Sequence, residues 1–369
     1  MSFLSPIDLY RTLTGLNHRI NDLLFSMTPR PVLDTSQCVG DRIWFSDLFQ
    51  LIEGKDIWSQ LLRSSIDTIR LCGTLVSNAL CNYNRSPKQL MSNQTFSHFF
   101  PSLRRLYITG NAANQIIISQ LFVPLSTTLR DVHFTFDAPF NSSSYYEVVN
   151  SFTNHELSFY RMVFDFENDD IKEHYDAKEY EWKQMHLPNT VYLSLYIKRL
   201  DDLYNLLDIQ SLPALYHLGV SFIKRGLIND VKLMNVNNIT SRLSFLKLSY
   251  MSMIDIHDNK PINLLQLIDN SLLSNLFPQL TIFWSSGKNI PLDDNFAKLV
   301  ILIVTHFEKL TEMIINKDSR YRDLGIHGHD LLRTQQRDIE NLLRNVHEFH
   351  DRNRMSIHWT NYPELRIWL

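Results

Sequence analysis

The stretch Leu103-Arg104-Arg105-Leu106-Tyr107-Ile108 decides the fold, because its pattern recurs along most of this chain of 369 residues. An apolar residue is followed by two variable positions, a second apolar residue, one variable position and a third apolar residue. Two more clear copies begin at Leu215 and Leu243. Weaker copies begin at Ile66, Leu129, Phe159, Thr190, Leu280 and Leu310, so that successive copies start 25 to 37 residues apart.

Each copy has the properties of a short buried strand. The last two apolar positions are two residues apart, so on a strand they point to the same side, and the residue between them points outward. The segments between copies, such as 111–122, 200–207 and 264–273, carry apolar residues at helical spacing. One strand and one helix cannot bury their apolar faces alone, whereas stacked copies can. The pattern therefore predicts parallel strands joined by helical crossovers.

The period lies in or near the range of leucine-rich repeats. The predicted fold class is α/β, an irregular leucine-rich-repeat solenoid over residues 61–369, preceded by a short helical segment over 1–27 and a linker and N-terminal cap over 28–60. Irregularity is expected because only the copy at Leu103 carries asparagine at the ladder position, Asn111. The alternative is an ordinary α/β domain with leucine-rich strands.

Composition excludes several classes of protein. With 36 Lys and Arg against 39 Asp and Glu, the formal net charge of −3 provides no global field for nucleic acid or an anionic membrane. The longest apolar run, 299–304, is far shorter than the roughly 20 residues of a membrane helix. We find no signal-peptide pattern, and the odd number of cysteines suits a reducing compartment. The expected location is the cytoplasm, with the nucleus as an alternative.

Sequence signatures of enzymes are weak. The phosphate-binding glycine motifs and the nucleophile elbow do not occur, and the chain has only 10 glycines. His327, His329 and Asp330 lie close together, and His347 and His350 are three residues apart. Since the H-E-x-x-H motif does not occur, we interpret these histidines as solvent-exposed. The sequence predicts neither catalysis nor a metal or cofactor.

Two charged stretches and the C-terminus complete the repeat region. The stretch 165–182 holds eight acidic residues among aromatic ones, typical of a solvated insertion or of a lip that receives a basic partner. The stretch 320–354 mixes seven arginines with six acidic residues, which predicts a solvated helix. Alternating apolar residues in 354–359, followed by 365–369, predict a hairpin that closes the open edge of the sheet.

The N-terminal stretch FLSPIDLYRTLTGLNHRINDLL, residues 3–24, has helical character, with Ser5 as a cap and Pro6 at the first helical position. The prolines at 29 and 31 interrupt the chain after it. This stretch resembles the second half of an F-box motif. The matching positions are Leu4, Pro6, Asp8, Leu9, Leu16, Asn17 and Arg19. The L-P-x-E-x-L half of the motif does not precede them, so either Met1 is a misplaced start or the motif is truncated.

The resemblance to F-box proteins with leucine-rich repeats implies a substrate receptor of a cullin-type ubiquitin ligase. The F-box would contact the linker subunit of the ligase, weakly if truncated, through Leu4, Pro6, Ile7 and Leu9. The repeat surface would bind an unknown target protein. The outward positions of the three clear copies supply the predicted target-binding residues: Arg104, Arg105, Tyr107, Tyr216, His217, Phe245 and Lys247. Alternatives are a scaffold without a ligase and, for residues 3–24, an amphipathic cap of the first repeat.

Overall fold

The computed structural model divides the chain into two compact units, unit 1 (residues 1–189) and unit 2 (residues 190–369). The boundary lies just before Thr190, where the fifth copy of the repeat pattern begins. Both units combine helices with a mostly parallel sheet. The residues that the structure describes are 6–26, 28, 30–34, 54–72, 100–109, 128–136, 145, 149, 159–166, 186–197, 206, 212–222, 243–250, 279–288, 294–307, 309–318, 326–344, 356–359 and 364–368.

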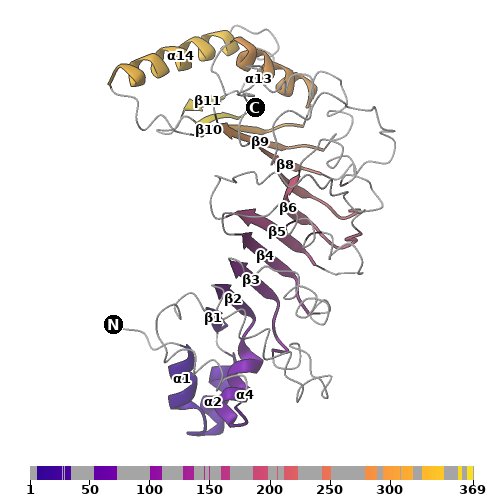
Figure 1. The fold of residues 1–369 in the computed structure, drawn as a ribbon, viewed down its shortest axis with the longest axis vertical. Coiled ribbons are helices and arrows are strands. Elements are labelled where there is room, and N and C mark those ends of the chain that lie inside the picture. The colour runs from indigo at the N-terminus through magenta and orange to yellow at the C-terminus, as the bar shows by residue number, and fades with distance from the viewer. Residues whose placement is uncertain are drawn as a thin grey trace. The chain divides into compact units, whose positions relative to one another are not determined.

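In unit 1 the described strands form a parallel sheet in chain order, as Figure 1 shows. The strands are β1 (Val32–Asp34), β2 (Thr68–Cys72), β3 (Arg105–Thr109), β4 (Asp131–Phe136) and β5 (Arg161–Phe166). Three helices pack on one another ahead of β2, namely α1 (Pro6–Leu13), α2 (His18–Ser26) and α4 (Ile57–Ser65). Unit 1 is thus a helical cluster followed by a sheet in which each strand pairs with the next one along the chain.

In unit 2 the first five strands are also parallel and in chain order, and the last two strands pair antiparallel. Its parallel strands, again in chain order, are β6 (Tyr192–Ile197), β7 (His217–Phe222), β8 (Phe245–Tyr250), β9 (Ile282–Lys288) and β10 (Glu312–Asp318). The predicted C-terminal hairpin is present as β11 (Ser356–Trp359) paired antiparallel with β12 (Glu364–Trp368). Since β12 also pairs antiparallel with β10, the hairpin extends the sheet and leaves β11 as its last strand.

Two described helices belong to unit 2. Helix α13 (Asp294–His306) follows β9 and precedes β10, so it is a helical crossover between two parallel strands. Its apolar residues Val300, Ile303 and Val304 are at most 2% exposed. Helix α14 (Ile326–Arg344) packs against α13 and lies inside the stretch for which the mixed charges predict a helix.

The repeat pattern locates nine of the strands. Each of β2 to β10 begins two residues after the start of a copy, as β3 at Arg105 does after Leu103. The prediction of an α/β fold with parallel, solenoid-like strands is confirmed. Strand β1 was missed, because the sequence assigns its three residues to a linker. The predicted helices 111–122 and 264–273 lie outside the described residues, as does 200–207 except for Leu206, which is helical.

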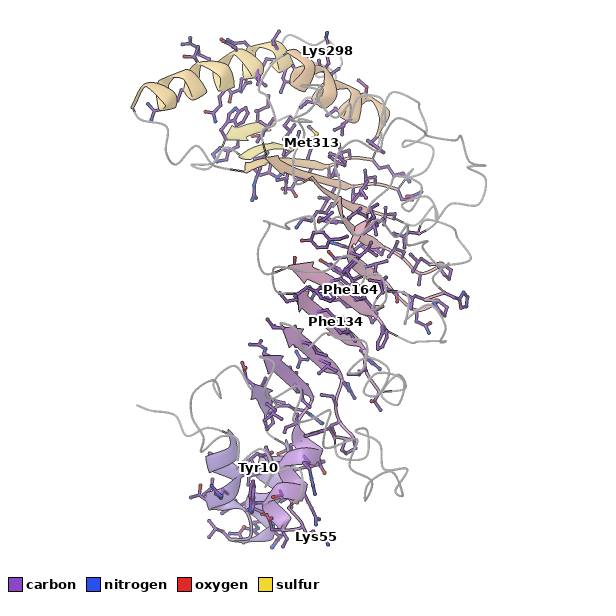
Figure 2. All side chains as sticks on the ribbon, in the orientation of Figure 1. Tyr10, Lys55, Phe134, Phe164, Lys298 and Met313 are labelled. Atoms are coloured by element: carbon purple, nitrogen blue, oxygen red, sulfur yellow. The ribbon has the colours of Figure 1, made fainter. Side chains whose placement is uncertain are left out.

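The core of each unit consists of every second residue of the strands, on the face of the sheet that is buried. In unit 1 the register aligns Ile69, Leu106, Val132 and Met162 across four strands, all at most 1% exposed. One pleat further along, Phe134 stacks on Phe164 with ring centroids 5.3 Å apart (Figure 2). In unit 2 the register aligns one buried residue from each of six strands, all at most 1% exposed: Leu193, Leu218, Leu246, Phe283, Met313 and Ile367.

Neighbouring repeats are also joined by a main-chain contact just before each strand. The carbonyl of Asp67 accepts hydrogen bonds from two successive amides, those of Arg104 (2.9 Å) and Arg105 (3.0 Å). We call such groups strand-start carbonyls. They are Asp67, Arg104 and Arg130 in unit 1, and Val191, Tyr216, Ser244 and Thr281 in unit 2. Because donor and acceptor both belong to the main chain, this contact does not depend on the type of side chain.

Candidate protein-binding surfaces

The predicted target-binding residues lie on the sheet face opposite the buried rows, or at the turns that lead into it. In unit 1, Arg105 and Tyr107 alternate with buried Leu106 and Ile108 along β3, and exposed Arg104 precedes the strand. In unit 2, His217 and Phe245 are paired in register and Lys247 is paired with Gly219. Tyr216, just before β7, is 55% exposed. The predicted set is therefore divided between the two units.

Each sheet has an outward first row and an outward third row. The first row contains the residue at the start of each strand, and the third row the residue two positions later. In unit 1 the first row is Val32, Thr68, Arg105, Asp131 and Arg161, and the third row is Asp34, Arg70, Tyr107, His133 and Val163. In unit 2 the first row begins Tyr192, His217 and Phe245, and the third row begins Ser194, Gly219 and Lys247.

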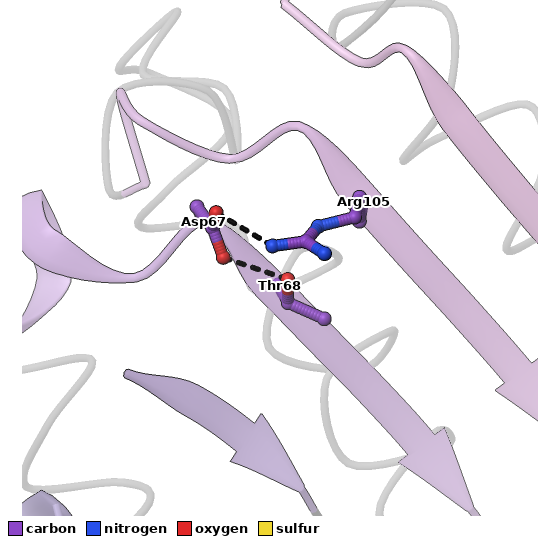
Figure 3. Close-up of polar contacts among 3 residues, drawn as sticks. All are labelled: Asp67, Thr68 and Arg105. Atoms are coloured by element: carbon purple, nitrogen blue, oxygen red, sulfur yellow. Dashed lines mark hydrogen bonds and ion pairs between the residues drawn. The ribbon is translucent and has the colours of Figure 1, made fainter. Parts of the chain in front are cut away.

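In the first row of unit 1, one ion pair joins neighbouring repeats. A guanidinium nitrogen of Arg105 lies 2.8 Å from Oδ2 of Asp67, and the hydroxyl of Thr68 donates to Oδ1 of the same carboxylate at 2.7 Å (Figure 3). The hydrogen bond to Asp67 raises the pKa of Arg105, partly opposed by burial. Both oxygens of the Asp67 carboxylate therefore already have partners within the sheet.

The third row of unit 1 connects charges and rings. Arg70 lies 3.6 Å from Asp34 and stacks over the ring of Tyr107, with its guanidinium carbon 5.4 Å from the ring centroid. The ring of Tyr107 is in turn 5.7 Å from that of His133. Burial lowers the pKa of His133, while Asp165 opposes and Arg161 adds to this shift. His133 is thus held toward its neutral form within a charged face.

At the turns before β3, β4 and β5, three exposed residues occupy equivalent positions in neighbouring repeats: Arg104, Arg130 and Tyr160. We call this row the arginine edge. Within the described part of the chain, no ion pair or side-chain hydrogen bond involves either arginine. Sequence reasoning identified Arg104 but missed Arg130 and Tyr160, because outward residues were taken only from the three clear copies. The equivalent position in the weaker copies at Leu129 and Phe159 would have identified both.

Unit 2 has an aromatic stack in its first row instead. The ring of His217 lies between those of Tyr192 and Phe245, with centroids 3.9 Å and 3.8 Å away and planes inclined by 18° and 10°. In the third row, Gly219 lies close against Ser194, since a Cβ atom there would lie 2.9 Å from the Ser194 hydroxyl oxygen. Because the stacked rings face one another, their edges rather than their faces point away from the sheet.

The helical cluster of unit 1 is built by local signals in the sequence. Asn17 caps α2 by accepting a hydrogen bond from the Ile20 amide at 3.0 Å, and Gly15 turns the chain between α1 and α2 with φ +86°. Fully buried Tyr10 donates its hydroxyl to the Leu24 carbonyl at 2.6 Å, and burial raises the pKa of its phenol. Figure 2 shows Tyr10 among these helices.

The same cluster carries exposed apolar side chains. The exposed fractions are 62% for Leu16, 66% for Leu23, 47% for Phe25 and 60% for Ile57. Apolar residues that remain exposed together often mark a binding surface.

The positions expected to contact a ligase linker are described only in part. Pro6, Ile7 and Leu9 lie in α1, and Leu9 is half-buried. Leu4 lies outside the described residues. Of the residues that match the F-box motif, Asn17 has a defined structural role, as the cap of α2.

The described residues contain neither a candidate metal site nor a candidate membrane-spanning helix. No group of three His, Cys, Asp or Glu side chains there has the arrangement of a metal site. In the same residues, no helix is both long enough and apolar enough to span a membrane. The histidines at 347 and 350 lie outside the described residues.

No protein-family model matches the chain, and no curated protein or solved structure matches it significantly.

Proposed function

We propose that this chain is a leucine-rich-repeat protein that recognises other proteins and serves as a substrate receptor of a cullin-type ubiquitin ligase. The observation that carries this proposal is the combination, within unit 1, of a helical cluster with exposed Leu16, Leu23 and Ile57 and a sheet whose outer face is charged. The exposed apolar residues of the helical cluster would bind the ligase linker, and the outer faces of the sheets would bind the target.

The sequence and the local structure of the helices support an adaptor role. The described residues that resemble the F-box motif lie in α1, at the turn after it and in the first turn of α2. A helical segment that only sealed the first repeat would turn its large apolar side chains toward the core. Leu23 is instead 66% exposed although the same helix buries Leu24.

The test is co-purification of the full chain with a recombinant ligase linker subunit. We expect weak binding by the native chain and stronger binding when an L-P-x-E-x-L segment is fused ahead of Phe3, because an additional helix adds buried apolar area. Leu23→Asp should reduce binding of the fused form more than tenfold, which corresponds to about 1.4 kcal/mol or more. The matched control is Leu342→Asp, an exposed leucine of α14 in unit 2, which should leave binding unchanged.

A second candidate function is a protein-binding scaffold without a ligase. It is favoured by the charged face of unit 1 and the aromatic stack of unit 2, since neither surface needs the helical cluster. If neither the native nor the fused chain binds the linker, the scaffold is the better explanation and the ligase role is rejected.

A further inference from the structure

We propose that the arginine edge of unit 1, formed by Arg104, Arg130 and Tyr160, binds an extended acidic segment of a partner protein. This inference rests on the proposed function of protein recognition and is independent of the ligase role. It specifies the chemistry of the partner: two acidic side chains at alternate positions, followed by an apolar residue.

The three residues are neighbours through their main chains. The Arg104 carbonyl accepts from the Arg130 amide at 2.8 Å, and the Arg130 carbonyl accepts from the Tyr160 amide at 2.8 Å. Strands so paired are about 4.8 Å apart, and the row therefore spans about 10 Å from the first residue to the third. Arg104 and Arg130 are exposed, and Tyr160 is 54% exposed.

Among the described residues, no ion pair involves either arginine of this edge. The strand starts around the edge carry Arg104, Arg105 and Arg130 together with Asp67 and Asp131. Asp67 is already bound to Arg105 at 2.8 Å and to the Thr68 hydroxyl at 2.7 Å. The edge is therefore complementary to an anionic partner.

The residue types indicate which anion. A guanidinium group pairs with a carboxylate through two parallel hydrogen bonds, and Arg and Tyr are enriched at the energetic centres of protein interfaces. Alternate side chains of an extended peptide are about 6.7 Å apart, a separation that two flexible arginine side chains on adjacent strands can match. The next residues of the peptide would then lie over the exposed ring of Tyr160.

A protein segment suits this edge better than a nucleic acid. The chain carries a formal net charge of −3, and Asp34 and Asp165 lie on the outer face of the sheet that this edge borders. Nucleic-acid binding requires a track of cations along several phosphates, and the nearby carboxylates would repel that backbone. A short acidic segment needs only the edge itself.

The experiment is a fluorescence anisotropy titration of the full chain against a labelled synthetic peptide of alternating glutamate and alanine that ends in leucine. We expect saturable binding that weakens as salt increases. Replacing both arginines (R104Q/R130Q) should weaken binding about tenfold, because each exposed ion pair contributes only modestly. The matched control R333Q/R337Q removes the same charge from exposed positions of α14 and should bind like the native chain.

Four results would overturn the proposal: no binding of the acidic peptide, equal binding of a peptide with glutamine in place of glutamate, equal losses in the two double variants, or tighter binding of single-stranded RNA than of the peptide. The thermal unfolding of both variants is compared with that of the native chain, so that loss of structure is recognised. Linker binding without peptide binding rejects this inference but leaves the proposed function. Peptide binding without linker binding supports this inference and rejects the ligase role.

Discussion

Unit 1 and unit 2 use parallel strands in chain order and main-chain contacts of the same kind at the strand starts, but their described outward ring contacts lie in different rows. In unit 1 the third row holds Arg70, Tyr107 and His133, in contact with charged neighbours. In unit 2 the ring stack is in the first row, and in the third row Gly219 lies close against Ser194. The difference shows that buried rows and main-chain contacts determine the fold, while the outward rows are available for two kinds of surface.

The largest expected effect tests whether residues of the buried rows contribute more to the free energy of unfolding than residues of the outward rows. Phe134→Ala in unit 1 should lower the free energy of unfolding by about 3–5 kcal/mol, because it removes a fully buried ring stacked on Phe164. Tyr107→Ala, at a half-buried outward position, should cost clearly less. Urea unfolding followed by circular dichroism measures both values. Equal losses would contradict the division between the rows.

The next effect tests the close approach of Gly219 to Ser194 in the third row of unit 2. Gly219→Val should lower the free energy of unfolding by about 1–3 kcal/mol, because overpacked positions cost that much. The new Cβ would meet the Ser194 hydroxyl oxygen at 2.9 Å and its Cβ at 3.3 Å. Adding Ser194→Gly should restore part of the loss, with Ser194→Gly alone as the control. If the second substitution restores nothing, the close approach to Ser194 is not the cause.

A smaller effect compares the ring contacts of the two units. The coupling energy between His217 and Phe245, whose ring planes are inclined by only 10°, should be about 0.5–1.5 kcal/mol. The coupling between Tyr107 and His133 should be smaller, since those rings are 5.7 Å apart and inclined by 50°. Double-mutant cycles with alanine give both energies from equilibrium unfolding. A larger coupling in unit 1 would reverse the comparison.

The smallest effect is a pH dependence located in unit 1. Since burial lowers the pKa of His133, the unfolded chain binds a proton at this residue at a higher pH than the folded chain does. Its contribution to stability is therefore complete above about pH 6.5 and is lost as pH falls through the lowered pKa. His133→Gln should reduce the loss of stability between about pH 7 and pH 5, measured by urea unfolding at each pH. Identical pH profiles for the variant and the native chain would contradict this assignment.

The sequence predicts the strands well because their pattern is local. Apolar residues at the first, fourth and sixth positions of a copy suffice to place β3, and the fourth and sixth positions alone find even the weak copy at Thr190. Strand β1 escaped because it has only three residues and follows the prolines at 29 and 31. A pattern that needs six residues cannot be recognised in three.

The surfaces were less predictable, because they depend on register between strands. The pairing of Tyr192 with His217 and of Ser194 with Gly219 joins residues 25 positions apart in the chain. No local pattern indicates which outward residues become neighbours when the spacing between copies varies. Arg130 and Tyr160 were missed for a different reason: they belong to weaker copies, from which no outward residues were taken, although their positions within each copy equal that of Arg104.

The strand-start carbonyls have a consequence for how such a chain can change over generations. The residues that supply them are as different as Asp67, Arg104, Val191 and Tyr216, so no particular side chain has to be inherited at the joint between two repeats. A duplicated stretch of coding sequence can therefore insert one more repeat that pairs with both of its neighbours at once. Only proline is forbidden at the two donating positions, because it has no amide hydrogen. The number of repeats can therefore change during evolution, and the outward residues of each new repeat can evolve to bind a partner.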